Sequence, residues 1–318
     1  MKYTGKQIDT EKYTLCDEWK KGIYEYIARN PENIHDRDNH NNFFFKRTIW
    51  KEDIHIGEFL ASIIGKKCGF KICDCELYKA QLSKKDSFDV GILSYVNKSV
   101  DDILVNPNSI IREFFKLQGL DGEEAYRADI DKIMNAMFAY ITKNERPYQE
   151  FLNFKQDFID MVVFDMKYLN PDRVQTNWMM RKNKQSGEID LYPMFDNEMI
   201  LGFDEDIPKK DFLDKEIELI NKSKFSSITT PKDFQNGNRF SDYRDFMKYL
   251  LNKYPIQTQK AIEKTKKFSS EELKYVLEEI DGITELRKLQ VIKLFEKREE
   301  KINEICNQYE KGQCYRTA

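Results

Sequence analysis

The chain of 318 residues is 40% hydrophobic, which suffices for one large domain or for two lobes with cores of their own. Its charged residues, 34% of the chain, nearly cancel to a net charge of −3, which argues against a general nucleic-acid binder. No apolar run approaches the ~20 residues of a membrane span, and the N-terminus lacks the apolar segment of a signal peptide. We therefore expect a cytoplasmic protein, in the cell that makes it or in a target cell that it enters.

The first hundred residues alternate between strand patterns and one helix. Strands are predicted over residues 13–16, 22–27, 43–46, 70–77 and 89–96, with an exposed polar loop over 30–42. Residues 54–67 carry apolar side chains at helical spacing, and Gly69 is placed to cap the end of that helix. This pattern predicts a small lobe of strands and one helix over residues 1–96.

Beyond residue 96 the pattern becomes helical. Helices are predicted over residues 109–115, 122–144, 148–168, 243–254 and 286–309. Another helix is expected to begin at Ser269, because Glu272 follows it at the spacing of a capping box. We therefore expect an α+β fold whose second lobe, residues 97–318, is larger and mostly helical.

The six cysteines are expected to be free thiols. Cys68, Cys73 and Cys75 lie close together, but their spacing is not a usual zinc pattern, and no histidine follows nearby. Free thiols fit a reducing compartment, in agreement with the cytoplasmic expectation.

Polar residues gather at the ends of a hairpin predicted from strands at residues 177–180 and 189–192. Asp172 lies in the loop that follows the 148–168 helix, Asn177 comes five positions later, and Asp196 follows the second strand. Two carboxylates and one carboxamide suit a hard cation and a phosphate, with Asp172 left to handle a proton.

Taken singly, the candidate residues have simpler explanations. Lys46, at the end of a strand, would most simply extend to water. Glu58 lies about 200° around its helix from Ile56, away from the apolar stripe, which predicts a solvent-facing charge. Asp172 is most simply a turn residue, whereas Asp196 closes a buried strand and needs a partner or a metal.

At these residues the chain resembles the HipA-like serine/threonine kinases, and most of all their short stand-alone members. Residues 170–177 read NPDRVQTN, similar to the family's N-x-D-R/G-H-x-x-N loop, and residues 193–196 read PMFD, similar to its P-[IL]-[FY]-D motif. A third match runs from Glu58 to Gly69, followed by a strand. Two positions depart: Val174 stands where the family has histidine, and Asn197-Glu198 stands where protein kinases have Phe-Gly.

The resemblance implies a two-lobed protein-kinase-like fold that uses ATP and Mg²⁺. It implies that Lys46 contacts the ATP phosphates and that Glu58 pairs with this lysine. It further implies that Asp172 is the catalytic base, and that Asn177 and Asp196 are the magnesium ligands.

The nucleotide itself is expected to bind at two further places. The resemblance makes Ser94, Tyr95 and Val96 the hinge whose backbone meets adenine. Gly22 is the only glycine between residues 13 and 42, so we assign it to the loop that covers the phosphates.

The resemblance, supported by these residues, implies a protein kinase that phosphorylates Ser or Thr hydroxyls, its own included, with an antitoxin-like or host protein as a partner. Two alternatives stay open. The glycine-poor loop favours a pseudokinase that serves as an interaction module, since phosphate-binding loops usually need several glycines. The third hypothesis is a kinase of a small molecule or lipid, because related folds support both.

Overall fold

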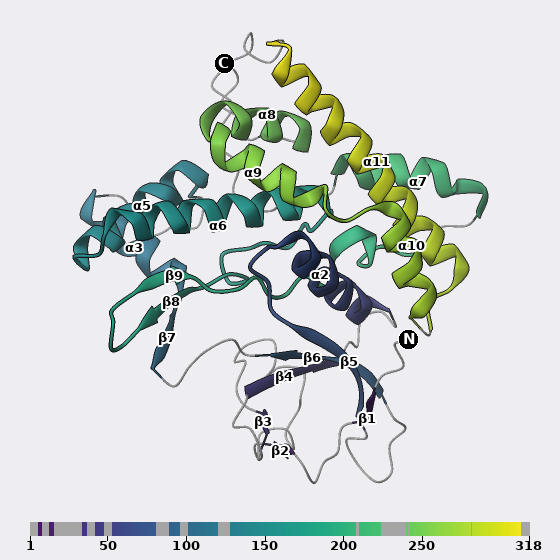
Figure 1. Cartoon of the computed structure of the whole chain (residues 1–318), viewed down its shortest axis with the longest axis horizontal. Helices are drawn as coiled ribbons and strands as arrows, with labels where there is room; N and C mark the ends of the chain where they lie inside the picture. Colours follow the sequence, from purple (N-terminus) through teal and green to yellow (C-terminus); the bar gives the residue numbers. More distant parts are fainter. Residues whose placement is uncertain are drawn as a thin grey trace.

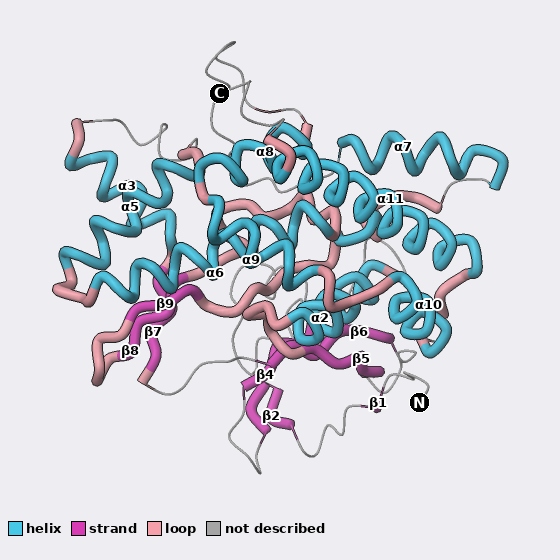
Figure 2. The backbone as a smooth tube through the Cα atoms, turned by 45° about the horizontal axis from the view of Figure 1, so that its top comes forward, coloured by secondary structure: helices cyan, strands magenta, loops and turns pink. Residues whose placement is uncertain are grey.

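The structure is a computed structural model, and it describes residues 6–7, 13–15, 34–36, 42–47, 53–80, 89–95, 101–119, 128–207, 210–223, 240, 242–280 and 282–312. In these ranges a six-stranded sheet lies on one side of the molecule and most helices lie on the other, with α2 (Ile54–Cys68) between them (Figure 1). The view in Figure 2 shows the same division. The α+β fold with a small sheet and a larger helical part is therefore confirmed.

The six-stranded sheet has the strand order β1-β5-β6-β4-β3-β2. Its neighbours are antiparallel except for β1 and β5, which run parallel. The strands are β1 (Lys6–Gln7), β2 (Tyr13–Leu15), β3 (Ile34–Asp36), β4 (Asn42–Arg47), β5 (Cys75–Ala80) and β6 (Asp89–Tyr95). The predicted loop over residues 30–42 is thus wrong at β3, and the predicted strand over 22–27 lies outside the described residues.

Helix α2 packs against β5 and β6 through its apolar stripe, which includes Leu60 and Ile64, both fully buried. Gly69 ends the helix in the left-handed conformation, with a φ of 78°, as the sequence predicts. Burial of such a stripe gives a short helix most of its stability, because propensity alone leaves a helix of this length marginal.

A second, smaller sheet lies beside the helical part (Figure 1). It consists of β7 (Asp102–Val105), β8 (Met180–Asn183) and β9 (Ile189–Leu191), in the order β7-β8-β9 and antiparallel throughout. The predicted hairpin is therefore present, but its first strand starts at Met180 instead of Asn177. The shift leaves Asn177 in the loop, where its side chain can serve a site.

The helical part is built around α6 (Tyr148–Lys167), whose last turns are fully buried. The other elements are α3 (Pro107–Leu117), α5 (Ile130–Lys143), η2 (Ile200–Gly202), η3 (Lys210–Phe212), α7 (Leu213–Ser223), α8 (Tyr243–Lys253), α9 (Pro255–Thr265), α10 (Ser270–Glu279) and α11 (Glu285–Glu310). No helix in the described ranges is long and apolar enough to cross a membrane.

The last helix, α11, joins distant parts of the chain through two buried arginines. Arg287 forms an ion pair with Asp53, just before α2, with Nε 2.7 Å from Oδ2. Arg298 donates to the side-chain and backbone oxygens of Asn221, and its guanidinium stacks 3.6 Å from the ring centre of Tyr243. Through Arg287 the helical part therefore holds the start of α2.

Candidate active site

The site begins at a buried carboxylate near the end of α6. Asp165 is fully buried among apolar neighbours, where an unpaired charge would cost several kcal/mol. Its partner is Arg173, also fully buried, with Nε 3.1 Å from Oδ2 and Nη2 3.0 Å from Oδ1. Burial alone would lower the pKa of Arg173, but Asp165 raises it, so the arginine stays charged.

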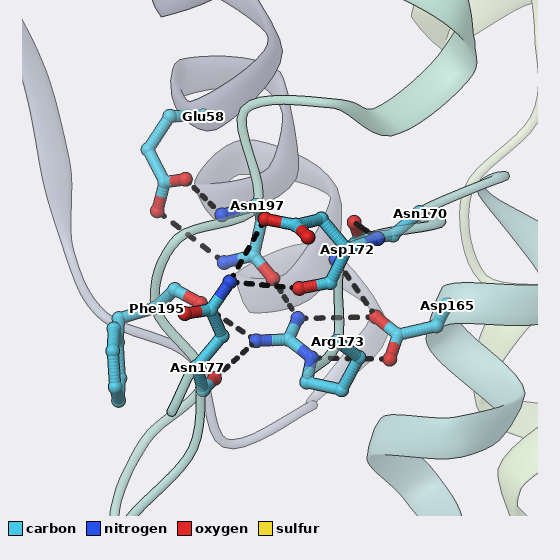
Figure 3. A network of polar contacts seen from close by, with 8 residues as sticks. All are labelled: Glu58, Asp165, Asn170, Asp172, Arg173, Asn177, Phe195 and Asn197. Atoms are coloured by element: carbon cyan, nitrogen blue, oxygen red, sulfur yellow. Dashed lines mark hydrogen bonds and ion pairs between the residues drawn. The ribbon is translucent and has the colours of Figure 1, made fainter. Parts of the chain in front are cut away.

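Arg173 also contacts the two chain segments on either side of the hairpin (Figure 3). Its Nη1 donates to the backbone carbonyls of Asn177 and Phe195, at 2.7 Å in each case. Its Nη2 donates to the side-chain oxygen of Asn197. One guanidinium thus connects the loop after α6 with the loop after β9.

Asp172 and Asn177 lie in direct contact. The Asn177 amide nitrogen donates to the Asp172 carboxylate at 3.0 Å and to its backbone carbonyl at 2.7 Å. The Asp172 backbone amide donates to the side chain of Asn170 at 3.2 Å. Asn177 is buried and Asp172 half-buried, so the carboxylate is held in orientation while part of it remains open to water.

Asp196 follows Phe195 in the loop after β9 and is half-buried. Its φ of 58° lies in the left-handed region, which costs a residue with a Cβ about 1 kcal/mol and which Asp and Asn tolerate best. The preceding chain is fixed by Met194, whose backbone pairs with Lys71 and Cys73 at 2.9 Å. Residues held in such sparsely populated backbone conformations cluster at functional sites.

Glu58 is buried, with 3% of its surface exposed, so the prediction of a solvent-facing side chain is wrong. Its carboxylate accepts hydrogen bonds from the backbone amide of Asn197 and from the Asn197 side chain, the latter at 3.3 Å. This face of α2 is covered because it packs against the segment that follows Asp196. The approach is close at Gly57, where an added Cβ would lie 2.1 Å from the carbonyl oxygen of Glu198.

The residues predicted to meet the nucleotide lie on the six-stranded sheet or outside the described residues. Lys46 is on β4, paired with Ile92 of β6, and its side chain is not described. Ser94 and Tyr95 end β6. Val96 and Gly22 lie outside the described residues, as do Cys16 and Cys314, so the contact between Lys46 and Glu58 and the phosphate-covering loop stay predictions.

Two buried thiols, those of Cys73 and Cys75, lie near the charge of Glu58. The Sγ of Cys75 is 3.2 Å from the Ser94 hydroxyl and 3.9 Å from a Glu58 carboxylate oxygen. Burial, followed by the nearby charge of Glu58, raises the pKa of the Cys73 thiol to about 12 and also raises that of Cys75. In the described part of the chain Cys68, Cys73, Cys75 and Cys306 lie outside disulfides, as predicted.

The predicted metal ligands offer oxygen atoms only, which suits Mg²⁺. Asn177 uses its amide nitrogen on Asp172, and its side-chain oxygen, which accepts from the Thr176 hydroxyl at 3.3 Å, has a second lone pair for another partner. In the described part of the chain no group of three or more His, Cys, Asp or Glu side chains could hold a metal ion. A site built from Asn177 and Asp196 therefore fits a cation that takes its remaining ligands from phosphate and water.

Sequence reasoning named no role for Asp165, Arg173 or Asn197. The available signal was the position of Asp165, a carboxylate within the apolar run MVVFDM, which predicts a buried partner. The identity of the partner was not available, because the spacing of apolar residues does not show that the loop after α6 turns Arg173 back onto Asp165.

Comparison with known proteins supports the fold. No protein-family model matches the sequence, and no curated protein matches it. Among solved structures, the proinflammatory kinase CtkA from Helicobacter pylori is similar, with a TM-score of 0.68 and 18% identity over 88% of this chain and 94% of that one. HipA from Shewanella oneidensis, in a toxin–antitoxin complex with HipB and operator DNA, has a TM-score of 0.50 and 12% identity over 83% of this chain and 59% of that one. The chain therefore has the fold of the HipA-like kinases, as its motifs predict.

Proposed function

We propose that the chain is an ATP- and Mg²⁺-dependent serine/threonine protein kinase of the HipA-like type. The supporting observation is one set of contacts that joins Asp172, Asn177 and Glu58 through Arg173 and Asn197 (Figure 3). An Asp, an Asn and a Glu in one place are three of the five residue types that phosphoryl transfer uses, and the proposal adds Lys46 and Asp196 to them. The likeness of the fold to the kinase CtkA and to HipA points the same way.

In this proposal Asp172 accepts the proton of the substrate hydroxyl as that oxygen attacks the γ-phosphorus of ATP. The hydrogen bond from Asn177 keeps the Asp172 carboxylate in place for this transfer. Asn177 and Asp196 would hold Mg²⁺, which when bound neutralises charge on the phosphate oxygens. Glu58 orients Lys46 toward the phosphates.

The nucleotide in this proposal lies between the two lobes, residues 1–96 and 97–318. The backbone of Ser94, Tyr95 and Val96 meets adenine, and the loop that contains Gly22 covers the phosphates. The substrate is a protein with a Ser or Thr hydroxyl, which includes a second copy of this chain. We extend to this chain an antitoxin-like or host protein partner, because the structure of HipA includes HipB.

The proposal is tested by binding and transfer measurements on the same preparations. Wild type should be stabilised by Mg·ATP in a thermal-shift titration, and it should transfer labelled phosphate to itself or to a protein extract. Asp172→Ala should retain Mg·ATP binding but lose at least about a hundredfold in transfer rate. Asp196→Ala should lose both the magnesium-dependent part of the shift and the transfer. Asp214→Ala is the matched control, because this exposed carboxylate pairs with Lys293 on the surface.

Other outcomes separate the alternatives. A wild type that binds Mg·ATP without any transfer would support an interaction module instead of an enzyme. Label that enters a lipid or metabolite pool, and not protein, would identify a small-molecule kinase. Wild-type activity in both carboxylate variants would contradict the proposed roles of Asp172 and Asp196.

A further inference from the structure

We propose that Arg173 is the positioning residue of the site: it sets the geometry of the metal-binding residues and of Glu58 without touching substrate itself. The inference rests on the proposed function, because it concerns the residues assigned there to Mg²⁺ and to the phosphates. It goes beyond that function because it names the group that fixes the positions of these residues relative to one another.

The first observation is that every donor of Arg173 is used. A guanidinium has five N–H groups in a fixed plane. Nε and one N–H of Nη2 go to Asp165, both N–H groups of Nη1 go to the carbonyls of Asn177 and Phe195, and the last N–H of Nη2 goes to Asn197. A planar group with all its donors engaged has one orientation, so its acceptors are fixed relative to one another.

The second observation is that two of these acceptors are backbone carbonyls at or next to the proposed metal ligands. The carbonyl of Asn177 belongs to one proposed metal ligand, and that of Phe195 belongs to the residue just before the other, Asp196. Because both carbonyls accept from the same nitrogen at 2.7 Å, their oxygens lie within twice that distance of each other. The spacing between the two proposed ligands therefore depends on one atom of Arg173.

The third observation extends the effect to α2. The Asn197 side chain accepts from Arg173 through its oxygen and donates to Glu58 through its nitrogen, at 3.3 Å. The amide thus transmits the orientation of the guanidinium to the carboxylate of Glu58 (Figure 3). One buried cation connects the proposed metal site with the proposed phosphate site.

The ion pair with Asp165 offsets the free energy that is needed to bury Arg173, since either charge alone in the core would strongly destabilise the protein. Asp165 is held in turn by the amide of Asn170, at 3.0 Å. Lysine would keep the charge but lack the planar fork, so it could not serve Asn177, Phe195 and Asn197 together.

The test uses a paired substitution that removes both buried charges, Arg173→Met with Asp165→Leu. Replacing a buried ion pair by apolar residues of similar size is often neutral for stability. This variant also leaves the acceptors on Asn177, Phe195 and Asn197 without their donor, so it is expected to fold but to melt below wild type. Arg173→Lys, which retains the charge opposite Asp165, is the second variant should the first not fold. Arg298→Met is the matched control: Arg298 is equally buried and also donates to backbone carbonyls, those of Met166 and Asn221.

Two measurements are made on each protein. Hydrogen exchange without ligand follows the amide of Asn197, which donates to Glu58. Calorimetry with a non-hydrolysable ATP analogue gives the dissociation constant for Mg²⁺. Both Arg173 variants should exchange this amide at least tenfold faster and bind Mg²⁺ at least tenfold more weakly, whereas Arg298→Met should change neither, whatever its melting temperature.

The outcomes distinguish this inference from the proposed function. If wild type binds Mg·ATP but the folded Arg173 variants keep its exchange rate and Mg²⁺ affinity, the inference is overturned and the proposed function stands. If Arg298→Met weakens Mg²⁺ binding as much as the Arg173 variants do, the effect is a general loss of stability, and the inference is again wrong. If wild type binds no Mg·ATP, the proposed function is overturned and the inference with it.

Discussion

The close packing of α2 against the segment after Asp196 can be tested at one atom. At Gly57 an added Cβ would lie 2.1 Å from the carbonyl oxygen of Glu198, 2.9 Å from its carbonyl carbon and 3.3 Å from the Cβ of Phe203. The nearest obstacle is backbone, which cannot rotate away as a side chain can. Gly57→Ala therefore requires α2 to move away from this segment.

The size of the effect follows from three contributions. Alanine should gain about 1 kcal/mol over glycine in a helix interior. Overpacking a filled core costs roughly 2 kcal/mol, and weakening the charged hydrogen bond from the Asn197 amide to Glu58 costs roughly 2 kcal/mol more. The sum is a net loss of about 3 kcal/mol, opposite in sign to the effect that helix propensity alone would give.

Urea denaturation measures this loss directly, and Mg·ATP binding shows whether the site is disturbed with it. Gly65→Ala on the same helix is the control. There the nearest atoms to the new Cβ all belong to the side chain of Ile72, with Cγ2 at 2.7 Å, and a side chain can change rotamer. Gly65→Ala should therefore cost less stability and leave binding unchanged. A Gly57→Ala protein as stable as wild type, or more stable, would refute the close packing of α2 described here.

Three further predictions concern α2 and the helices that follow it. Burial lowers the pKa of His55 in the folded protein to about 4, although the charge of Asp53 acts in the opposite direction. As the pH falls from 6.5 to 4, His55 is therefore protonated in the unfolded chain but not in the folded one, and the folded state loses stability. Wild type should lose up to about 3 kcal/mol of unfolding free energy in this window, and denaturation at several pH values should show that His55→Gln loses correspondingly less. Arg287→Met breaks the buried pair with Asp53 and should cost about 3–5 kcal/mol in urea denaturation, whereas Lys293→Met, which breaks a surface pair, should cost less than about 1 kcal/mol. Ser269→Ala removes a helix cap and should lower stability by about 1 kcal/mol, and an unchanged denaturation midpoint would contradict the capping role.

The helices with a clear apolar stripe could be predicted from the sequence. The helix predicted over residues 54–67 matches α2 to within one residue, and the capping box at Ser269 is present. Helix α7 is not among the predicted helices, although Leu213, Ile217 and Ile220 are buried at helical spacing.

Helix α9 had a weaker signal. Its buried face includes Thr258 and Thr265, whose hydroxyls donate to backbone carbonyls at 2.7–3.0 Å. Because these side chains satisfy their own hydrogen bonds, they can be buried without being apolar, and a hydrophobicity pattern does not detect them. Pro255 occupies the first helical position of α9, where its missing N–H would have no partner within the helix.

In the candidate site, the sequence motifs identified individual residues but not the contacts between them. The spacing of Asp172 and Asn177 marked a loop in which the two side chains do touch. The burial of Glu58 could not be foreseen, because a helical wheel shows only the apolar stripe of α2 and not the segment that covers its other face. The contacts of Arg173 could not be foreseen for the same reason, because its acceptors belong to separate segments of the chain.

The ion pair between Arg287 of α11 and Asp53 also bears on the order in which the protein folds. The two residues are 234 positions apart, so a chain emerging from the ribosome exposes α2 long before the arginine that holds its first turn. Contacts of such sequence separation form late and slow the folding of a domain. We therefore expect the residues that we assign to catalysis to reach their final arrangement only after α11 has been synthesised and has docked against the rest of the chain.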